Sequence, residues 1–105
     1  MTRMIQSLLV LAVVMFLAGA VCFAQSAGEA TYKAKCAMCH GATGTPSAGM
    51  AKSMGIKAAS DPSIQSLTVA QMIAAVKNGK GKMKPVAGLS DTQIKDVVVF
   101  YRGLK

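Results

Sequence analysis

The sequence has few of the residues from which common functional sites are built. It contains one histidine, four acidic residues and three cysteines in 105 residues. A structural zinc site needs four ligands, and there is no second Cys or His pair to complete such a set. The chain also has no obvious acid–base group, no repeat and no low-complexity tract. A chain of this length and composition is expected to form a single domain.

The N-terminus is rich in apolar residues and poor in charge. Arg3 precedes an almost uninterrupted apolar run over 5–20, and small residues follow it. This order is typical of a secretory signal peptide, and the run is short for a membrane span. We expect residues 1–24 to be a Sec-type signal peptide cleaved after Ala24, or alternatively after Ala20. Residues 25–105 then form one periplasmic domain; the alternative is a retained N-terminal membrane anchor.

The division into a leader and a mature domain explains why the number of cysteines is odd. Cys22 lies in the leader, so the mature chain keeps only Cys36 and Cys39. Lipid attachment at Cys22 is not expected, because Gly19 and Val21 do not fit the usual lipobox. The mature domain is strongly basic and small, and domains of this size usually need a staple, a metal or a cofactor.

Apolar periodicity and capping signals predict an all-α domain with long loops. Thr68 to Gln71 and Ser90 to Gln93 each fit a capping box, and Asn78-Gly79 fits a helix end. Helices are expected over 26–38, 50–57, 68–78 and from 90 to 104, with loops over 41–49, 58–66 and 79–89. The expected inward residues are Met50, Met54, Ile56, Met72, Ile73, Val76, Ile94, Val97, Val98, Tyr101 and Leu104, with Val99 and Phe100 widening the last face. Such a domain suits a fold wrapped around a cofactor.

The motif Cys36-Ala37-Met38-Cys39-His40 carries the chemistry. C-x-x-C-H is the attachment signature of c-type haem: both thiols bond to the haem vinyl groups, and the histidine becomes the proximal iron ligand. Three alternatives are a redox dithiol, half of a zinc site and a structural disulfide. The redox dithiol is less favoured because there is no βαβ pattern, and the zinc site because there is no second pair of ligands. A disulfide between these cysteines would close a loop of only two residues and would stabilise the chain very little.

Because His40 is the only histidine, a second imidazole from this chain cannot bind the other side of the iron. A methionine is the natural replacement, and the mature methionines are Met38, Met50, Met54, Met72 and Met83. Met38 lies within the attachment turn, and Met72 belongs to a helical stripe. Met83 stands in a Gly-rich loop between lysines, which favours it as a thioether ligand. Met50 and Met54 remain alternatives.

Four lysines surround Met83: Lys77, Lys80, Lys82 and Lys84. They are expected either to steer an acidic redox partner toward the cofactor or simply to be solvated. Gly79-Lys80-Gly81-Lys82 lacks the spacing and hydroxyl residue of a phosphate-binding loop. Nucleic-acid binding is not expected either, because no supporting motif is present.

The attachment motif, the stretch Asn78–Met83 and the stretch Leu89–Ile94 together resemble the small class I, mono-haem cytochromes c of bacteria, with histidine and methionine ligands. The resemblance implies a cytochrome c fold of three to four short helices wrapped around one covalently attached haem c. It also implies that Gly28, Tyr32 and Phe100 lie where the first and last helices cross. Met83-Lys84-Pro85 departs from the family's usual Met-Pro pair. Pro46 is the nearest candidate for the proline whose carbonyl orients the ligand histidine.

The expected function is a one-electron carrier rather than an enzyme, cycling between Fe(II) and Fe(III). The protein is expected to be a monomer without stable membrane insertion after leader cleavage, its haem buried by Tyr32, Ile73, Val76 and Val98. One alternative is an electron-entry haem subunit of a larger oxidoreductase complex. Another, if Met83 is not a ligand, is a gas- or peroxide-binding haem protein.

Overall fold

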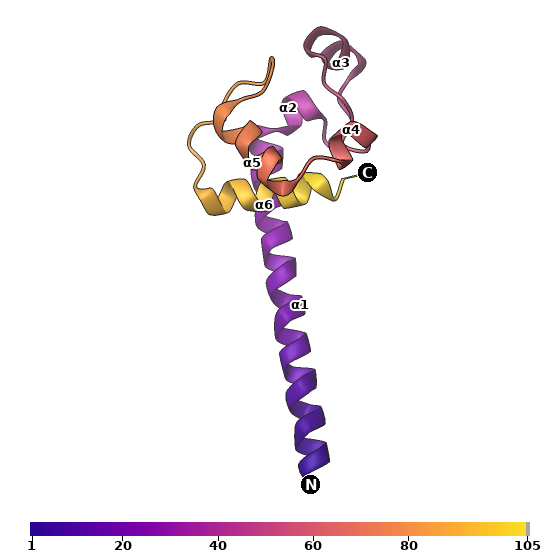
Figure 1. Cartoon of the computed structure of the whole chain (residues 1–105), viewed down its shortest axis with the longest axis vertical. Coiled ribbons are helices and arrows are strands. Elements are labelled where there is room, and N and C mark those ends of the chain that lie inside the picture. The colour runs from indigo at the N-terminus through magenta and orange to yellow at the C-terminus, as the bar shows by residue number, and fades with distance from the viewer. Residues whose placement is uncertain (105) are drawn as a thin grey trace.

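The computed structural model describes residues 1–104, without the side chains of residues 17–26. The chain begins with one long helix, α1 (Thr2–Lys35), which extends away from the rest of the molecule in Figure 1. The expected helix start at residue 26 is therefore not a boundary, since no proline precedes Pro46 to interrupt the helix. The expected end at Met38 is also wrong: α1 ends at Lys35, and a separate turn, α2 (Ala37–His40), follows Cys36.

The first turns of α1 carry large apolar side chains that remain exposed, among them Met4, Leu8 and Phe16. Only the C-terminal part of α1 reaches the other helices (Figure 1). The predicted cleavage positions Ala20 and Ala24, and Cys22, lie outside the residues with described side chains. Among the described residues, no helix has both the length and the apolar character needed to cross a membrane.

The middle of the chain holds two short helices. α3 (Ala48–Met54) begins two residues earlier than expected, because the Ser47 side chain accepts a hydrogen bond from the Met50 amide. It ends at Gly55, whose left-handed φ of 67° explains why the expected helix to residue 57 does not form. The region 58–66, expected to be a loop, contains α4 (Pro62–Gln65), with Asp61 as N-cap and Pro62 in the first turn.

The two following helices match the sequence prediction closely. α5 (Val69–Asn78) and α6 (Asp91–Arg102) both begin with a complete capping box, from Thr68 and Ser90 respectively. The loop between them contains an isolated bridge between Lys80 and Met83. No strand occurs within residues 1–104, so the all-α class is confirmed for the described chain, with α2 and α4 as additional single turns.

The core has two parts, which meet on α6. In one part, Met72 and Val76 of α5 pack with Ile94 and Val98 of α6, and all four are buried. In the other part, α1 crosses α6, where the Tyr32 ring lies 5.4 Å from the Phe100 ring. The helix crossing expected from Gly28, Tyr32 and Phe100 is present. Val99, expected to widen the buried face, is instead 44% exposed.

Gly28 allows this crossing, because a Cβ atom there would overlap the Asp96 carbonyl oxygen and lie 2.9 Å from Phe100 Cβ. We expect Gly28→Ala to destabilise the holoprotein by about 1–3 kcal/mol through overpacking. Thermal unfolding measures this effect, with Gly49→Ala as control. Nothing lies within 4 Å of a Cβ at Gly49, and alanine is the better helix former. An unchanged midpoint for Gly28→Ala would contradict the close helix crossing.

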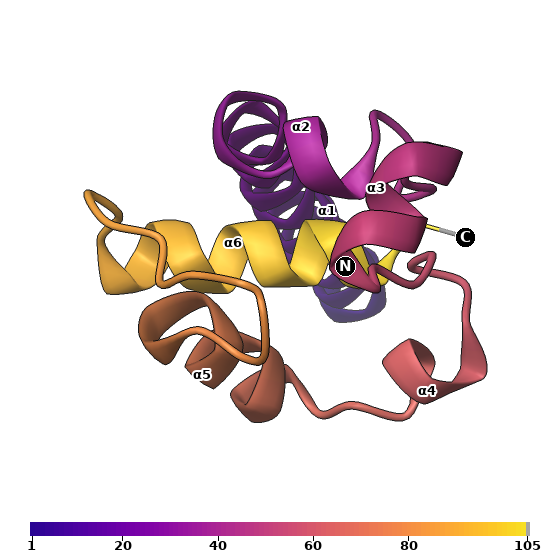
Figure 2. The same cartoon turned by 90° about the horizontal axis from the view of Figure 1, so that it is seen from above.

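Seen from above, α6 runs through the middle of the molecule (Figure 2). α2 and the C-terminal end of α1 lie on one side of it, α5 lies on the other, and the rest of α1 passes behind α6 (Figure 2). Extensive contacts join α1 to α6, α5 to α6 and α1 to α2, but not α2 to α5. The attachment motif on α2 is thus joined to the helix preceding Met83 chiefly through the crossing of α1 and α6.

Candidate cofactor site

The two cysteines and the histidine of the motif occupy one helical turn. The Cys36 carbonyl accepts hydrogen bonds from the Cys39 amide at 3.2 Å and the His40 amide at 2.9 Å. Cys36 and Cys39 are half-buried and are not bonded to each other, so the structural-disulfide alternative finds no support. The turn therefore presents two free thiols and an imidazole from adjacent positions.

The pKa directions of Cys36 and His40 argue against a reactive dithiol and for a neutral imidazole. Burial, and secondarily the neighbouring Cys39, raises the pKa of the Cys36 thiol. Reactive dithiols of the C-x-x-C type instead have a lowered thiol pKa. Burial lowers the pKa of His40, so its imidazole is neutral at pH 7 and has a lone pair available for a metal.

His40 is enclosed on one side only. Its Nδ1 atom is buried without a hydrogen-bond partner among the described residues, whereas Nε2 is not enclosed in this way. The ring packs against Tyr101 in a T-shaped arrangement, with ring centroids 5.3 Å apart. Nε2 is therefore the nitrogen left open to a ligand. The expectation that the Pro46 carbonyl orients this histidine is not met in the structure, since Nδ1 has no acceptor.

Met83 closes a tight turn. The amide of Lys80 donates to the Met83 carbonyl and the amide of Met83 to the Lys80 carbonyl, both at 3.0 Å. Gly81 takes a left-handed φ of 59°, which this turn requires. The turn is tied to α5, because the Val86 amide donates to the Val76 carbonyl at 2.9 Å. These hydrogen bonds give the Met83 backbone a defined position.

The Met83 side chain is more involved in packing than the sequence suggested. It is half-buried and contacts the cluster formed by Met72, Val76, Ile94 and Val98. The sequence alternatives lie on α3, where Met50 is half-buried and Met54 is 36% exposed. Packing against the α5–α6 cluster therefore accounts for part of the Met83 environment.

Two of the four lysines near Met83 have partners. Lys77 forms an exposed 2.8 Å ion pair with Asp91, and this hydrogen bond and charge lower the Asp91 pKa. Lys82 donates to the Ser53 carbonyl at 2.9 Å and so connects the loop to α3. Lys80 and Lys84 are exposed. The lysine cluster is therefore divided between structural contacts and side chains available to a partner.

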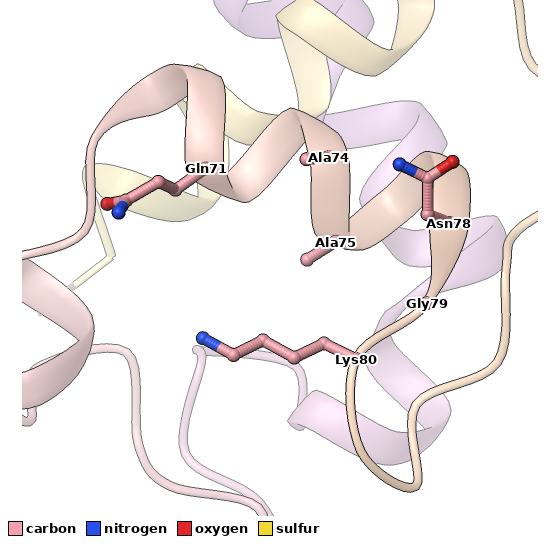
Figure 3. A pocket seen from close by; sticks show the side chains of 6 residues that line it. All are labelled: Gln71, Ala74, Ala75, Asn78, Gly79 and Lys80. Carbon is pink, nitrogen blue, oxygen red and sulfur yellow. The ribbon is translucent and has the colours of Figure 1, made fainter.

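A cavity of about 270 Å³ lies on the face of α5 turned away from its buried residues. It is lined by Gln71, Ala74, Ala75, Asn78, Gly79 and Lys80, and the Lys80 side chain extends opposite Ala75 in Figure 3. The short side chains of Ala74 and Ala75 leave this space. No group of three His, Cys, Asp or Glu side chains gathers as a metal site within the described residues.

Three comparisons identify the class of protein. The family model described as "Cytochrome C oxidase, cbb3-type, subunit III" matches residues 23–100. The cytochrome c-555 of Chlorobaculum thiosulfatiphilum is 38% identical over 86 residues, covering 74% of this chain and 93% of that protein. The solved structure of the KustC0563 c-type cytochrome matches with a TM-score of 0.66 at 26% identity, over 74% of this chain and 96% of that one.

These matches, together with the C-x-x-C-H turn, define a c-type cytochrome. The chain belongs to the family of small mono-haem c-type cytochromes, and its cofactor is covalently bound haem c. The described residues fit this group: the thiols are free, His40 Nε2 is not among the buried unpartnered atoms, and α2 and α5 make no extensive contact with each other.

Proposed function

We propose that this cytochrome is an exported one-electron carrier whose haem is bonded to Cys36 and Cys39 and ligated by His40 and Met83. The main support for this proposal is the attachment turn, where two free thiols and a neutral imidazole lie next to one another. The bound haem supplies the Fe(II)/Fe(III) couple. With Met83 as a ligand, its thioether would raise the reduction potential, and His40 and Met83 together would keep small ligands off the iron.

In this proposal the side chains of the protein bind and orient the haem and exclude water from it. The capping boxes and the apolar cluster hold α5 against α6, and the hydrogen-bonded turn holds Met83 beside this pair. Rigid packing of this kind favours electron transfer, because the protein around the haem then changes little in geometry between the two oxidation states.

An electron-entry subunit of a larger complex is the second candidate, because the matching family description names an oxidase subunit. Gel filtration of native extract separates the two: a free carrier elutes at the size of a small monomer. Elution of all the haem-containing chain with a large oxidoreductase complex would overturn the free-carrier proposal.

In this proposal the chain is exported, and the haem is attached in the periplasm. The exposed apolar side chains at the start of α1 fit a leader that does not belong to the folded domain. Mass spectrometry of the purified holoprotein should give a chain beginning after Ala24 or Ala20. A chain that retains residues 1–20 and stays with the membrane fraction would support the anchored alternative.

The exposed lysines should speed docking with an acidic redox partner. We expect Lys80→Gln with Lys84→Gln to slow bimolecular electron transfer by roughly three- to tenfold at low salt. Lys33→Gln with Lys95→Gln, on α1 and α6, changes the net charge equally and serves as control. Stopped-flow kinetics at increasing salt measures both pairs. Equal slowing in both would mean that the loop lysines act only through the net charge.

A further inference from the structure

Tyr32 is the most enclosed large side chain in the described structure. It is 1% exposed, lies 5.4 Å from the Phe100 ring, and stacks on Tyr101 with ring centroids 5.9 Å apart. These contacts involve the ring alone, and phenylalanine would provide them equally well. The hydroxyl group therefore needs a separate explanation.

The hydroxyl donates a hydrogen bond of 2.6 Å to the carbonyl of Gly41, the residue directly after His40. Gly41 has a φ of 81°, and a Cβ atom there would overlap the Thr45 carbonyl oxygen. Its amide is also held, since it donates to the Ala37 carbonyl at 2.8 Å. Gly41, the residue after His40, is thus held at both its amide and its carbonyl, and the Gly44 amide also donates to that carbonyl at 3.3 Å.

The backbone of Tyr32 contacts the other end of the same segment. Its carbonyl accepts the Cys36 amide at 2.9 Å, where α1 ends. One residue therefore holds the attachment segment at both ends, at Cys36 through its main chain and at Gly41 through its side chain.

The orientation of the His40 ring depends on its backbone, because the ring lacks the hydrogen bond that usually fixes a metal-bound histidine. A metal-bound histidine generally donates its second ring nitrogen to an acceptor, which fixes the orientation of the ring. Nδ1 of His40 is buried without a partner. The ring can then be oriented only by its backbone and by packing, and the ring it packs against, Tyr101, itself stacks on Tyr32.

We propose that the Tyr32 hydroxyl is a positioning group that sets the orientation of the His40 ring on the haem iron through the Gly41 carbonyl. The inference rests on the proposed role of His40 as axial ligand. Tyr32 does not touch the iron, and its ring remains a core element. Removal of the hydroxyl alone should therefore change the orientation of the ligand while the fold is kept.

NMR of the ferric holoprotein tests this inference, because the haem-methyl shifts report the plane of the axial imidazole. For Tyr32→Phe we expect an altered haem-methyl pattern and roughly three- to tenfold faster hydrogen exchange at the Gly41 amide. The control Phe100→Leu loosens packing around the same ring but keeps the hydroxyl. It should lower the thermal midpoint and leave the haem-methyl pattern unchanged.

The positioning role would be overturned if Tyr32→Phe lowered the thermal midpoint but kept the wild-type haem-methyl pattern. If wild-type spectra show no axial histidine at all, the proposed ligation fails instead. Where Tyr32→Phe yields no holoprotein, the wild-type hydroxyl proton is measured directly. Slow exchange with a nuclear Overhauser contact to the Gly41–Gly44 loop supports the hydrogen bond, and fast exchange overturns it.

Discussion

Replacing Met83 with alanine is expected to convert a low-spin, six-coordinate haem into a high-spin ferric haem that binds carbon monoxide readily once reduced. If Met83 is the proposed ligand, this variant removes the thioether, and the sequence contains no histidine besides His40 to replace it. The reduction potential should fall by a sizeable part of the roughly 0.8 V range over which axial ligands act. Visible spectra of both oxidation states and a redox titration measure these changes.

Met50→Ala and Met54→Ala are the matched controls, since both remove a methionine from nearby α3. Each should leave the spin state and potential of the holoprotein unchanged. Because Met83 also packs against the α5–α6 cluster, Met83→Ala should lower the thermal midpoint as well. A destabilised variant that keeps the wild-type spectrum would restrict Met83 to packing and move the ligand to Met50 or Met54.

Replacing Cys36 and Cys39 together with serine is expected to abolish covalent haem attachment completely. Serine keeps the size of each side chain but forms no thioether bond. Denaturing electrophoresis with haem staining measures attachment, and the double variant should give an unstained chain. Its apoprotein should also be poorly folded, because only a small apolar core remains and domains of this size need a cofactor or staple.

Cys22→Ser provides the control for this experiment, since Cys22 is proposed to lie in the leader. It should leave haem staining unchanged. The single variants Cys36→Ser and Cys39→Ser should each keep one thioether bond and show a shifted spectrum of the denatured haem. Full staining of the Cys36/Cys39 double variant would exclude these residues as the attachment sites.

The parts of the fold that depend on local hydrogen bonds could be predicted from the sequence. Thr68 with Gln71, and Ser90 with Gln93, announce the starts of α5 and α6, and both capping boxes are present. The same kind of signal was available for α4, where Asp61 precedes Pro62, and for α3, where Ser47 is the N-cap. Those two helices were missed or misplaced because they are too short to show an apolar period.

Contacts between distant segments could not be predicted in this way. The hydrogen bonds from Tyr32 to Gly41 and from Lys82 to Ser53 depend on how α1 and the Met83 loop lie against other elements. The packing of Met83 on the α5–α6 cluster also depends on a loop conformation. By contrast, the spacing of Cys36, Cys39 and His40 places them on one turn, so the candidate attachment site was recognisable at once.

The most direct test of the central claim is a redox-titrated visible spectrum of the purified protein, followed by denaturation. The account predicts one haem that stays on the chain in denaturant and a low-spin spectrum in both oxidation states. It also predicts a one-electron titration with a slope of about 59 mV per tenfold change in the ratio of the two states. A high-spin ferric spectrum with ready carbon monoxide binding would contradict the proposed electron carrier with histidine and methionine ligands.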